Sequence, residues 1–408
     1  RLVRLDAAAA AALDAEAAVE AHAEASDVVS AIRDLGLTVE PSRRAVFDAA
    51  GLAALGIGVL ALPAAAAAAT VVESGPVTYS DGTASAAFLA SATGTVGALA
   101  VQSDGKIVVG GQFSSVGDGS TTASRRGIAR FHANGAIDAT FADPNIGFQQ
   151  AVNGLEIDSA GRIVVAGGFS FVGGQSRRRL ARVHANGALD TDFADPNLNN
   201  TVNGLVLQGD LPVVVGYFTT AGASGTARAG AARFLADGTL DTTFANPQLA
   251  GGYYVPSGSS ATYGSAIVED SDERLLIGGL FGSVQGVDRR NIARLSANGV
   301  LDTSFAGPAD PDGGYAIDGP IMALAFEATD NVVAGGNFTV VAGETVGYLM
   351  RLGPNGALDT GFLPNVTGGR VVTMLVQGDG EILVGGYFSS VGGVTRSRIA
   401  RLTATGTL

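Results

Sequence analysis

A unit of about 55 residues recurs from residue 94 to the end of the chain, and this repeat limits the possible folds more than any single motif does. Each copy has an apolar run, the motif Gly-Gly-x-Phe or a variant of it, an Ala-Arg motif or variant, and a turn. The phenylalanines that end the first motif are Phe113, Phe169, Phe218, Phe281, Phe338 and Phe388, and the repeated arginines are Arg130, Arg182, Arg233, Arg294, Arg351 and Arg401.

Each copy is predicted to form four short antiparallel strands. In the first copy they cover residues 96–102, 106–113, 127–132 and 137–141. Asp-Gly or Asn-Gly separates the first two strands and the last two, and these dipeptides favour two-residue hairpins because both positions tolerate positive φ. Six such units predict an all-β, six-bladed β-propeller of four-stranded blades over residues 70–408.

An N-terminal strand is expected to close the ring. Residues 81–88 match residues 237–244, the end of another repeat, with Ser85 in place of the aspartate. The last copy of the repeat stops at Leu408, where this same element would begin. Residues 81–88 are therefore predicted to supply the final strand of the last blade, so that no sheet edge stays open to other chains.

The repeated arginine is followed in five copies by an aspartate eight residues later: Asp138, Asp190, Asp241, Asp302 and Asp359. The two residues lie on adjoining strands of one hairpin, which favours a structural ion pair in every blade. The alternative, a catalytic or metal-binding ring of carboxylates, is disfavoured because Ser85 would interrupt it. Arg401 is then expected to lack its acidic partner. Twelve of the 18 phenylalanines fall in the two repeated registers and are predicted to pack between blades.

The first 69 residues have a different composition. Residues 1–41 are rich in alanine and are predicted to form a helix. In the region 42–69, Arg43 and Arg44 precede an uncharged stretch, residues 49–69, that would be about 31 Å long as a helix and could cross a membrane core of roughly 30 Å. Three interpretations of this region stay open: a retained transmembrane anchor, a twin-arginine export signal ending in Ala-x-Ala, or a helix packed on the domain. The arginine pair favours a propeller outside the cytoplasm, periplasmic or at the cell surface.

Composition and motifs argue against several classes of function. A formal charge of −13 disfavours nucleic-acid binding, which needs a positive surface. There is no cysteine, and His132 and His184 occupy a repeat position that Leu235 and Ser296 take in other copies, so they do not indicate a metal site. No Gly-x-Ser-x-Gly or His-Glu-x-x-His motif occurs. We predict no catalytic residues, no metal and no cofactor.

Candidate binding residues lie in the loops that interrupt the repeat. The connections between the second and third strands share a face with the linkers between blades, where recognition residues tend to concentrate. The linkers 250–262 and 307–319 carry aromatic and acidic residues that suit a sugar, and the strand connections carry arginines that suit an anionic glycan or partner. The alternatives are solvated or subunit-contacting linkers, a weak calcium site in the second linker, and arginines ion-paired within the chain. The predicted ligand-binding residues are Tyr253, Tyr254, Tyr315, Asp310, Asp312, Arg177, Arg178, Arg289 and Arg290.

The combination of motifs resembles the delta-60 repeat family, propeller-like repeats of bacterial exported proteins. Residues 102–106 (Gln-Ser-Asp-Gly-Lys) and 377–381 (Gln-Gly-Asp-Gly-Glu) carry its first element, and residues 359–362 (Asp-Thr-Gly-Phe) its last. The resemblance covers residues 81–408 and implies export and a binding or surface-display role. It brings no established catalytic residues. The third copy departs from it, since residues 208–212 lack the Asp-Gly-Lys turn.

Together these observations predict a non-enzymatic extracytoplasmic binding or scaffolding propeller, held at the membrane through residues 43–69, whose partners are other proteins or a surface glycan. Two alternatives stay open. One is an accessory structural subunit of a membrane protein complex. The other is a carbohydrate-active hydrolase or lyase, which would use paired acids of the linkers.

Overall fold

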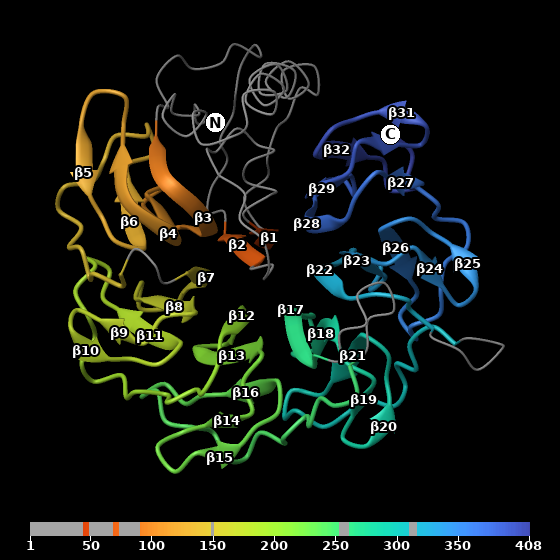
Figure 1. The fold of residues 1–408 in the computed structure, drawn as a ribbon, viewed down its shortest axis with the longest axis horizontal. Coiled ribbons are helices and arrows are strands. Elements are labelled where there is room, and N and C mark those ends of the chain that lie inside the picture. Colours follow the sequence, from red (N-terminus) through yellow and green to blue (C-terminus); the bar gives the residue numbers. More distant parts are fainter. Residues whose placement is uncertain (1–43, 49–67, 73–89, 148–150, 253–260, 310–315) are drawn as a thin grey trace.

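The computed structural model describes residues 44–48, 68–72, 90–147, 151–252, 261–309 and 316–408. Within these ranges the regular elements are all β-strands and no helix occurs. Figure 1 shows sheets arranged around a common centre, with the first strand of each sheet innermost. The described part of the chain is therefore an all-β, propeller-like repeat structure.

Each repeat forms a sheet whose first, second and last strands are paired antiparallel in that order, as in β7 (Val152–Ile157), β8 (Ile163–Gly167) and β11 (Leu180–Val183). The equivalent sheets are β12 (Val202–Gln208), β13 (Leu211–Gly216) and β16 (Ala231–Arg233); β17 (Tyr263–Glu269), β18 (Leu275–Leu280) and β21 (Ile292–Leu295); β22 (Ile321–Phe326), β23 (Val332–Gly336) and β26 (Leu349–Leu352); and β28 (Val371–Val376), β29 (Ile382–Gly386) and β32 (Ile399–Leu402). In the first repeat β3 (Ser91–Val101) and β4 (Ile107–Gly117) are longer, and β4 pairs with both β5 (Thr122–Ser124) and β6 (Ile128–Phe131).

The predicted fourth strand is present only as an isolated bridge, such as that between Phe131 and Ile137. The reason is the aspartate that follows. Its carboxylate Oδ1 accepts a hydrogen bond from the backbone N–H of Thr140 at 2.9 Å, and its carbonyl accepts one from the N–H of Phe141 at 3.2 Å. Asp138 thus closes a turn and draws the chain out of the ladder. In the first five repeats the prediction of four full strands is corrected to three strands and a bridge.

The arginine-rich connections, predicted to be loops, contain short hairpins that lie on the outer side of the ring in Figure 1. They are β9 (Phe171–Val172) with β10 (Gln175–Ser176), β14 (Thr220–Ala221) with β15 (Thr226–Ala227), β19 (Ser283–Val284) with β20 (Val287–Asp288), β24 (Val340–Val341) with β25 (Glu344–Thr345), and β30 (Ser390–Val391) with β31 (Val394–Thr395), where β27 (Val366–Thr367) also pairs with β30.

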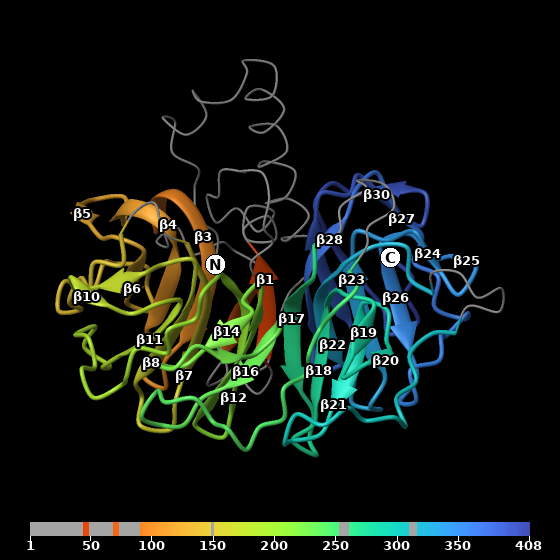
Figure 2. The ribbon, with the colours of Figure 1, turned by 60° about the horizontal axis from the view of Figure 1, so that its bottom comes forward.

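Two further strands, β1 (Arg44–Asp48) and β2 (Ala68–Val72), pair antiparallel, and β1 pairs with β28 through Val46 and Met374. Figure 2 shows β1 beside the inner strands. These strands stand at the two ends of the range 42–69 that was predicted to be helical. The rest of that range, the helix predicted at residues 1–41 and the closing segment 81–88 lie outside the described residues. None of the described segments is a helix long and apolar enough to cross a membrane.

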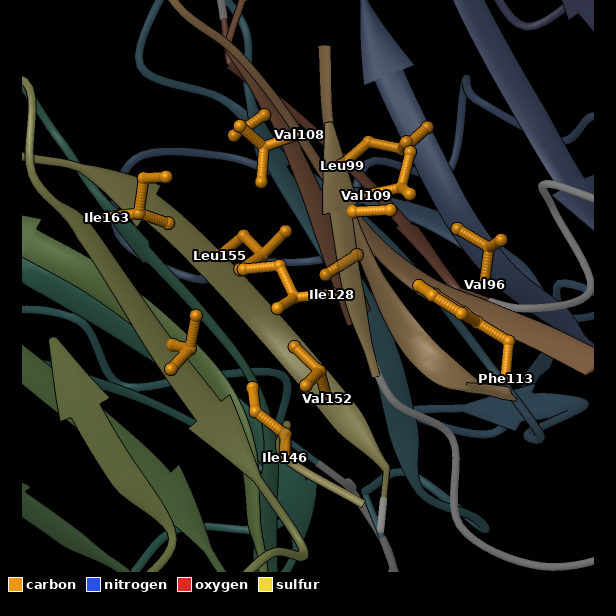
Figure 3. Close-up of a cluster of buried hydrophobic side chains, with 14 of the residues drawn as sticks. Val96, Leu99, Val108, Val109, Phe113, Ile128, Ile146, Val152, Leu155 and Ile163 are labelled. Atoms are coloured by element: carbon orange, nitrogen blue, oxygen red, sulfur yellow. The ribbon is translucent and has the colours of Figure 1, made fainter. Parts of the chain in front are cut away.

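The repeated phenylalanines form the packing between sheets, as predicted. Eleven of the twelve are fully buried, and the twelfth, Phe88, lies outside the described residues. Figure 3 shows how the first two sheets meet, with Leu155 and Val152 turned toward the strands of the first sheet. A Cβ on Gly110 would lie 2.5 Å from Cγ1 of Val152, so the first glycine of the Gly-Gly motif permits this close approach.

The repeated arginine and aspartate form the predicted structural pair. Nε of Arg233 lies 2.7 Å from Oδ2 of Asp241, and both side chains are buried. The same guanidinium donates a hydrogen bond to the carbonyl of Ala297 in the next repeat at 2.7 Å and stacks 5.0 Å from the ring centre of Phe244. We call this arrangement the arginine clamp. Equivalent pairs are Arg130 with Asp138, Arg182 with Asp190, Arg294 with Asp302, and Arg351 with Asp359.

The expectation that Arg401 lacks an acidic partner is wrong. Its guanidinium lies 2.9 Å from a carboxylate oxygen of Glu381. Arg401 is the register partner of Leu383, and Glu381 lies two residues earlier on the same strand, so its side chain emerges on the same face. In the first two repeats a lysine or an arginine, Lys106 or Arg162, holds the position of Glu381.

Candidate functional site

The residue between the glycines and the phenylalanine of the repeated motif differs from copy to copy, although its neighbours are nearly constant. In five repeats it follows or ends the second strand of the sheet, whereas Gln112 lies inside the longer β4. The backbone N–H bonds to the carbonyl opposite it, as in Tyr217 to Thr201 and Tyr387 to Arg370, both at 2.9 Å. We call the six variable residues and their partners the axial rim. Its pairs are Gln112 and Thr95, Gly168 and Ala151, Tyr217 and Thr201, Leu280 and Tyr263, Asn337 and Pro320, and Tyr387 and Arg370.

Hydrogen bonds between the inner strands of neighbouring sheets bring rim residues together at one end of the ring. Nδ2 of Asn153 donates to the carbonyl of Val202 at 2.8 Å, and Nδ2 of Asn203 donates to that of Gly264 at 2.9 Å. The hydroxyl of Ser265 makes the equivalent bond to the next sheet. These bonds join the starts of β7, β12, β17 and β22, and the rim pairs of those four repeats lie at these starts.

Two tyrosines of the rim meet across adjacent sheets. The ring centres of Tyr217 and Tyr263 are 4.3 Å apart at an interplanar angle of 31°. Burial raises the pKa of the Tyr217 hydroxyl, although a hydrogen bond with Tyr263 partly opposes this effect. The hydroxyl therefore stays protonated at neutral pH, and the pair presents two aromatic rings that also carry hydrogen-bonding groups.

A second aromatic group lies in the last repeat. The guanidinium carbon of Arg370 stacks 4.4 Å from the ring centre of Tyr387, which is 38% exposed. Within the described residues the Arg370 guanidinium has no hydrogen bond or ion pair, and its Nε is buried without a partner. The rim thus holds a cation that an aromatic ring orients and that no carboxylate of the described chain neutralises.

Five of the predicted binding residues, Tyr253, Tyr254, Tyr315, Asp310 and Asp312, lie outside the described residues. The linkers that carry them lead directly into Tyr263 and Pro320 of the axial rim. A further linker acid, Asp318, accepts hydrogen bonds at 2.8 Å from both the N–H and the hydroxyl of Thr339, so its role is structural.

The four predicted arginines lie at the ends of the outer hairpins and not on the rim (Figure 1). Arg177 is buried and donates to the carbonyls of Ser176 and Thr191, while Arg178 bonds to Asp195 through its N–H and to Asn197 through its guanidinium. Arg289 donates to the carbonyl of Asp288, and Arg290 pairs with the carboxylate of that residue at 3.3 Å. Of these four side chains, Arg290 makes the ion pair, while Arg177, Arg178 and Arg289 bond to carbonyl or amide oxygens of the chain.

Sequence reasoning missed Tyr217, Tyr263, Arg370 and Tyr387. A signal for Tyr217 and Tyr387 was available, because a variable position inside a constant motif indicates a residue that the fold itself does not specify. No comparable signal marked Arg370. No group of three or more metal-ligating side chains occurs within the described residues. Among the residues that the structure describes, the rim therefore offers aromatic faces, the unpaired guanidinium of Arg370, amides and hydroxyls, which suit binding.

The chain is similar to known proteins mainly in its fold. A family model described as a domain of unknown function (DUF5122) β-propeller matches residues 102–141, 161–193, 212–244, 271–305, 328–362 and 377–408, about half of the chain. None of the curated proteins matches the sequence.

Several solved structures are similar at low identity. They include the extracellular domain of a one-component system, BT4673, from B. thetaiotaomicron (14% identity, TM-score 0.44, 75% of this chain and 33% of that one) and the WD40 β-propeller domain of Doa1 (12%, 0.43, 72% and 77%). Virginiamycin B lyase from Staphylococcus aureus is another (13%, 0.41, 75% and 83%). This chain thus spans about a third of the length of the BT4673 domain.

Proposed function

We propose that this chain, which belongs to the family of DUF5122 β-propellers, is a non-enzymatic binding module that holds its ligand at the axial rim. The observation that carries the proposal is the rim chemistry. At positions that the repeat leaves free, the chain has the stacked pair Tyr217 and Tyr263 and the stacked pair Arg370 and Tyr387. Aromatic and arginine side chains are the residue types that dominate binding energy at recognition sites.

The rigidity of the scaffold supports this assignment. The phenylalanine packing and the arginine clamps join each described sheet to the next. The backbone at the rim positions is therefore held in a fixed arrangement. A ligand that binds to such a site meets side chains that lose little conformational freedom, which favours affinity. The described rim has no pairing of a nucleophile with a general base, which favours binding over catalysis.

We further propose that the repeats are delta-60 repeats and that they form a closed ring of six blades. Closure is supported by Leu375 and Leu383 of the last repeat, which belong to the same buried cluster as Leu99 and Val109 of the first. The delta-60 assignment is supported by the motifs at residues 102–106 and 359–362.

We also propose an extracytoplasmic location with attachment through residues 43–69, supported by the arginine pair and the uncharged stretch that follows it. In a bacterial host the full chain is expected to sediment with membranes, and a variant that lacks residues 49–67, which keeps β1 and β2, is expected to stay in the soluble fraction. Mass spectrometry of the N-terminus provides the control. A mature chain that starts at Thr70 would identify an export signal, and a full-length chain in the cytosol would contradict the proposed location.

The binding function is tested by Tyr387→Ala. A panel of oligosaccharides and peptides is screened against the purified protein by calorimetry, and Tyr387→Ala is expected to weaken the best ligand about tenfold or more, because it removes the exposed ring of the rim.

The matched control is Phe171→Ala, which removes an aromatic side chain that is 58% exposed on the outer hairpin β9. This variant is expected to bind as the parent protein does. A ligand that loses affinity in Phe171→Ala but not in Tyr387→Ala would place the binding surface on the hairpins and overturn the proposal.

A further inference from the structure

We propose that the ligand of the axial rim is an acidic saccharide, a chain that contains uronic acid residues, with Arg370 as the group that binds its carboxylate. This inference rests on the proposed function and deepens it, because it assigns the ligand class. It follows from three features of the described residues: paired aromatic rings, a cation without a counterion, and the charge of the molecule around them.

The aromatic rings indicate a ligand with an apolar face and polar edges. The Tyr217 and Tyr263 rings lie in contact at the rim and are half-buried, so their exposed parts offer a stacking surface with a hydroxyl at its border. Pyranose rings present C–H groups on one face and hydroxyls around the edge. Stacking on the rings and hydrogen bonding to the phenol of Tyr217 and to the amide of Gln112 satisfy both parts of such a ligand.

Arg370 indicates that the ligand carries an anionic group. Repeated arginines elsewhere in the described chain are neutralised within the fold, as Arg233 is by Asp241 and Arg401 is by Glu381. The half-buried Arg370 instead stacks on Tyr387 and meets no carboxylate of the described chain. A guanidinium that is oriented in this way loses little freedom on binding and can engage both oxygens of a carboxylate.

The overall charge disfavours a ligand that several cations would have to bind. With a formal charge of −13 the protein repels polyphosphates and nucleic acids over most of its surface. A uronic acid chain carries a single charge on each sugar and offers an apolar ring face between charges. Among the described residues the rim has one arginine without a counterion, stacked on Tyr387, so a sugar with one carboxylate and an apolar face fits it better than a polyphosphate does.

The experiment compares oligosaccharides that differ only in charge. Trimers of galacturonic, glucuronic and mannuronic acid are titrated into the full chain by calorimetry, each beside its methyl ester, in which the carboxylate is neutral. At least one acid is expected to bind about tenfold more tightly than its ester. Arg370→Gln is expected to abolish that preference, and Tyr387→Ala is expected to weaken acid and ester alike.

Each other outcome overturns the inference. If acid and ester bind equally, or if Arg370→Gln keeps the preference for the acid, the arginine does not bind a carboxylate. If none of the trimers binds, the ligand is not a uronic acid chain of these three sugars. In that case a peptide or neutral sugar whose affinity depends on Tyr387 would still support binding at the rim, so the two proposals fail separately. Thermal melting of Arg370→Gln shows that the variant is folded.

Discussion

Replacing Phe218 with alanine is expected to lower the free energy of unfolding by about 3–5 kcal/mol. The side chain is 1% exposed and belongs to a buried cluster that joins the second and third sheets, with Val164 and Leu180 on one side and Val202 on the other. Truncation removes the buried ring and leaves a cavity between two sheets that the arginine clamp and the inner-strand hydrogen bonds hold in place. Because those sheets cannot easily collapse into the cavity, the loss is expected to approach the upper end of this range.

Chemical denaturation monitored by circular dichroism measures the change, and Phe171→Ala is the matched control. Phe171 is a phenylalanine on the neighbouring repeat with 58% of its side chain exposed, so its truncation is expected to change stability by no more than about 0.5 kcal/mol. A shift of the melting temperature below one or two degrees for Phe218→Ala would contradict the placement of this ring between the sheets.

Asp241→Asn is expected to destabilise the protein by about 3 kcal/mol, because it leaves the buried guanidinium of Arg233 without a counterion. The carboxylate is 2.7 Å from Nε of Arg233, and the same arginine reaches Gln208 and the carbonyl of Ala297 in the next repeat. Removing one negative charge therefore weakens the tie between two repeats as well as one ion pair. Asp237→Asn, on the exposed turn of the same repeat, keeps its hydrogen bond to Thr239 and is expected to be nearly neutral.

The pH dependence of stability provides a second measurement for the same residue. Burial by itself would raise the pKa of Asp241, but hydrogen bonds from Thr243 and Arg233 outweigh it and lower the pKa below the ordinary value of 3.8. A carboxylate whose folded pKa is lowered stabilises the protein above its unfolded pKa, and this contribution disappears as the pH falls through the folded pKa. Stability is therefore expected to fall below about pH 4, and less steeply in Asp241→Asn. Equal slopes in both proteins would show that Asp241 contributes no such linkage.

Much of the fold could be predicted because its information is local. The strands, the hairpin turns and the buried phenylalanine registers follow from patterns within one repeat, and the pairing of Arg233 with Asp241 follows from their spacing on one hairpin. The errors also have local causes. The fourth strand is reduced to a bridge because aspartates such as Asp138 close a turn, and Arg401 finds Glu381 because another repeat position supplies the acid.

The sequence by itself determined that this chain is an all-β repeat protein whose aromatic residues and ion pairs serve its packing. Only the tertiary structure decided where its chemistry gathers. Tyr217 and Tyr263 belong to different repeats, and Arg370 stacks on a tyrosine 17 residues away across a strand pair. Repeat periodicity specifies each sheet, but the rim exists only after neighbouring sheets pack side by side. Its residues occupy positions that the packing leaves free, so no periodic pattern reveals them.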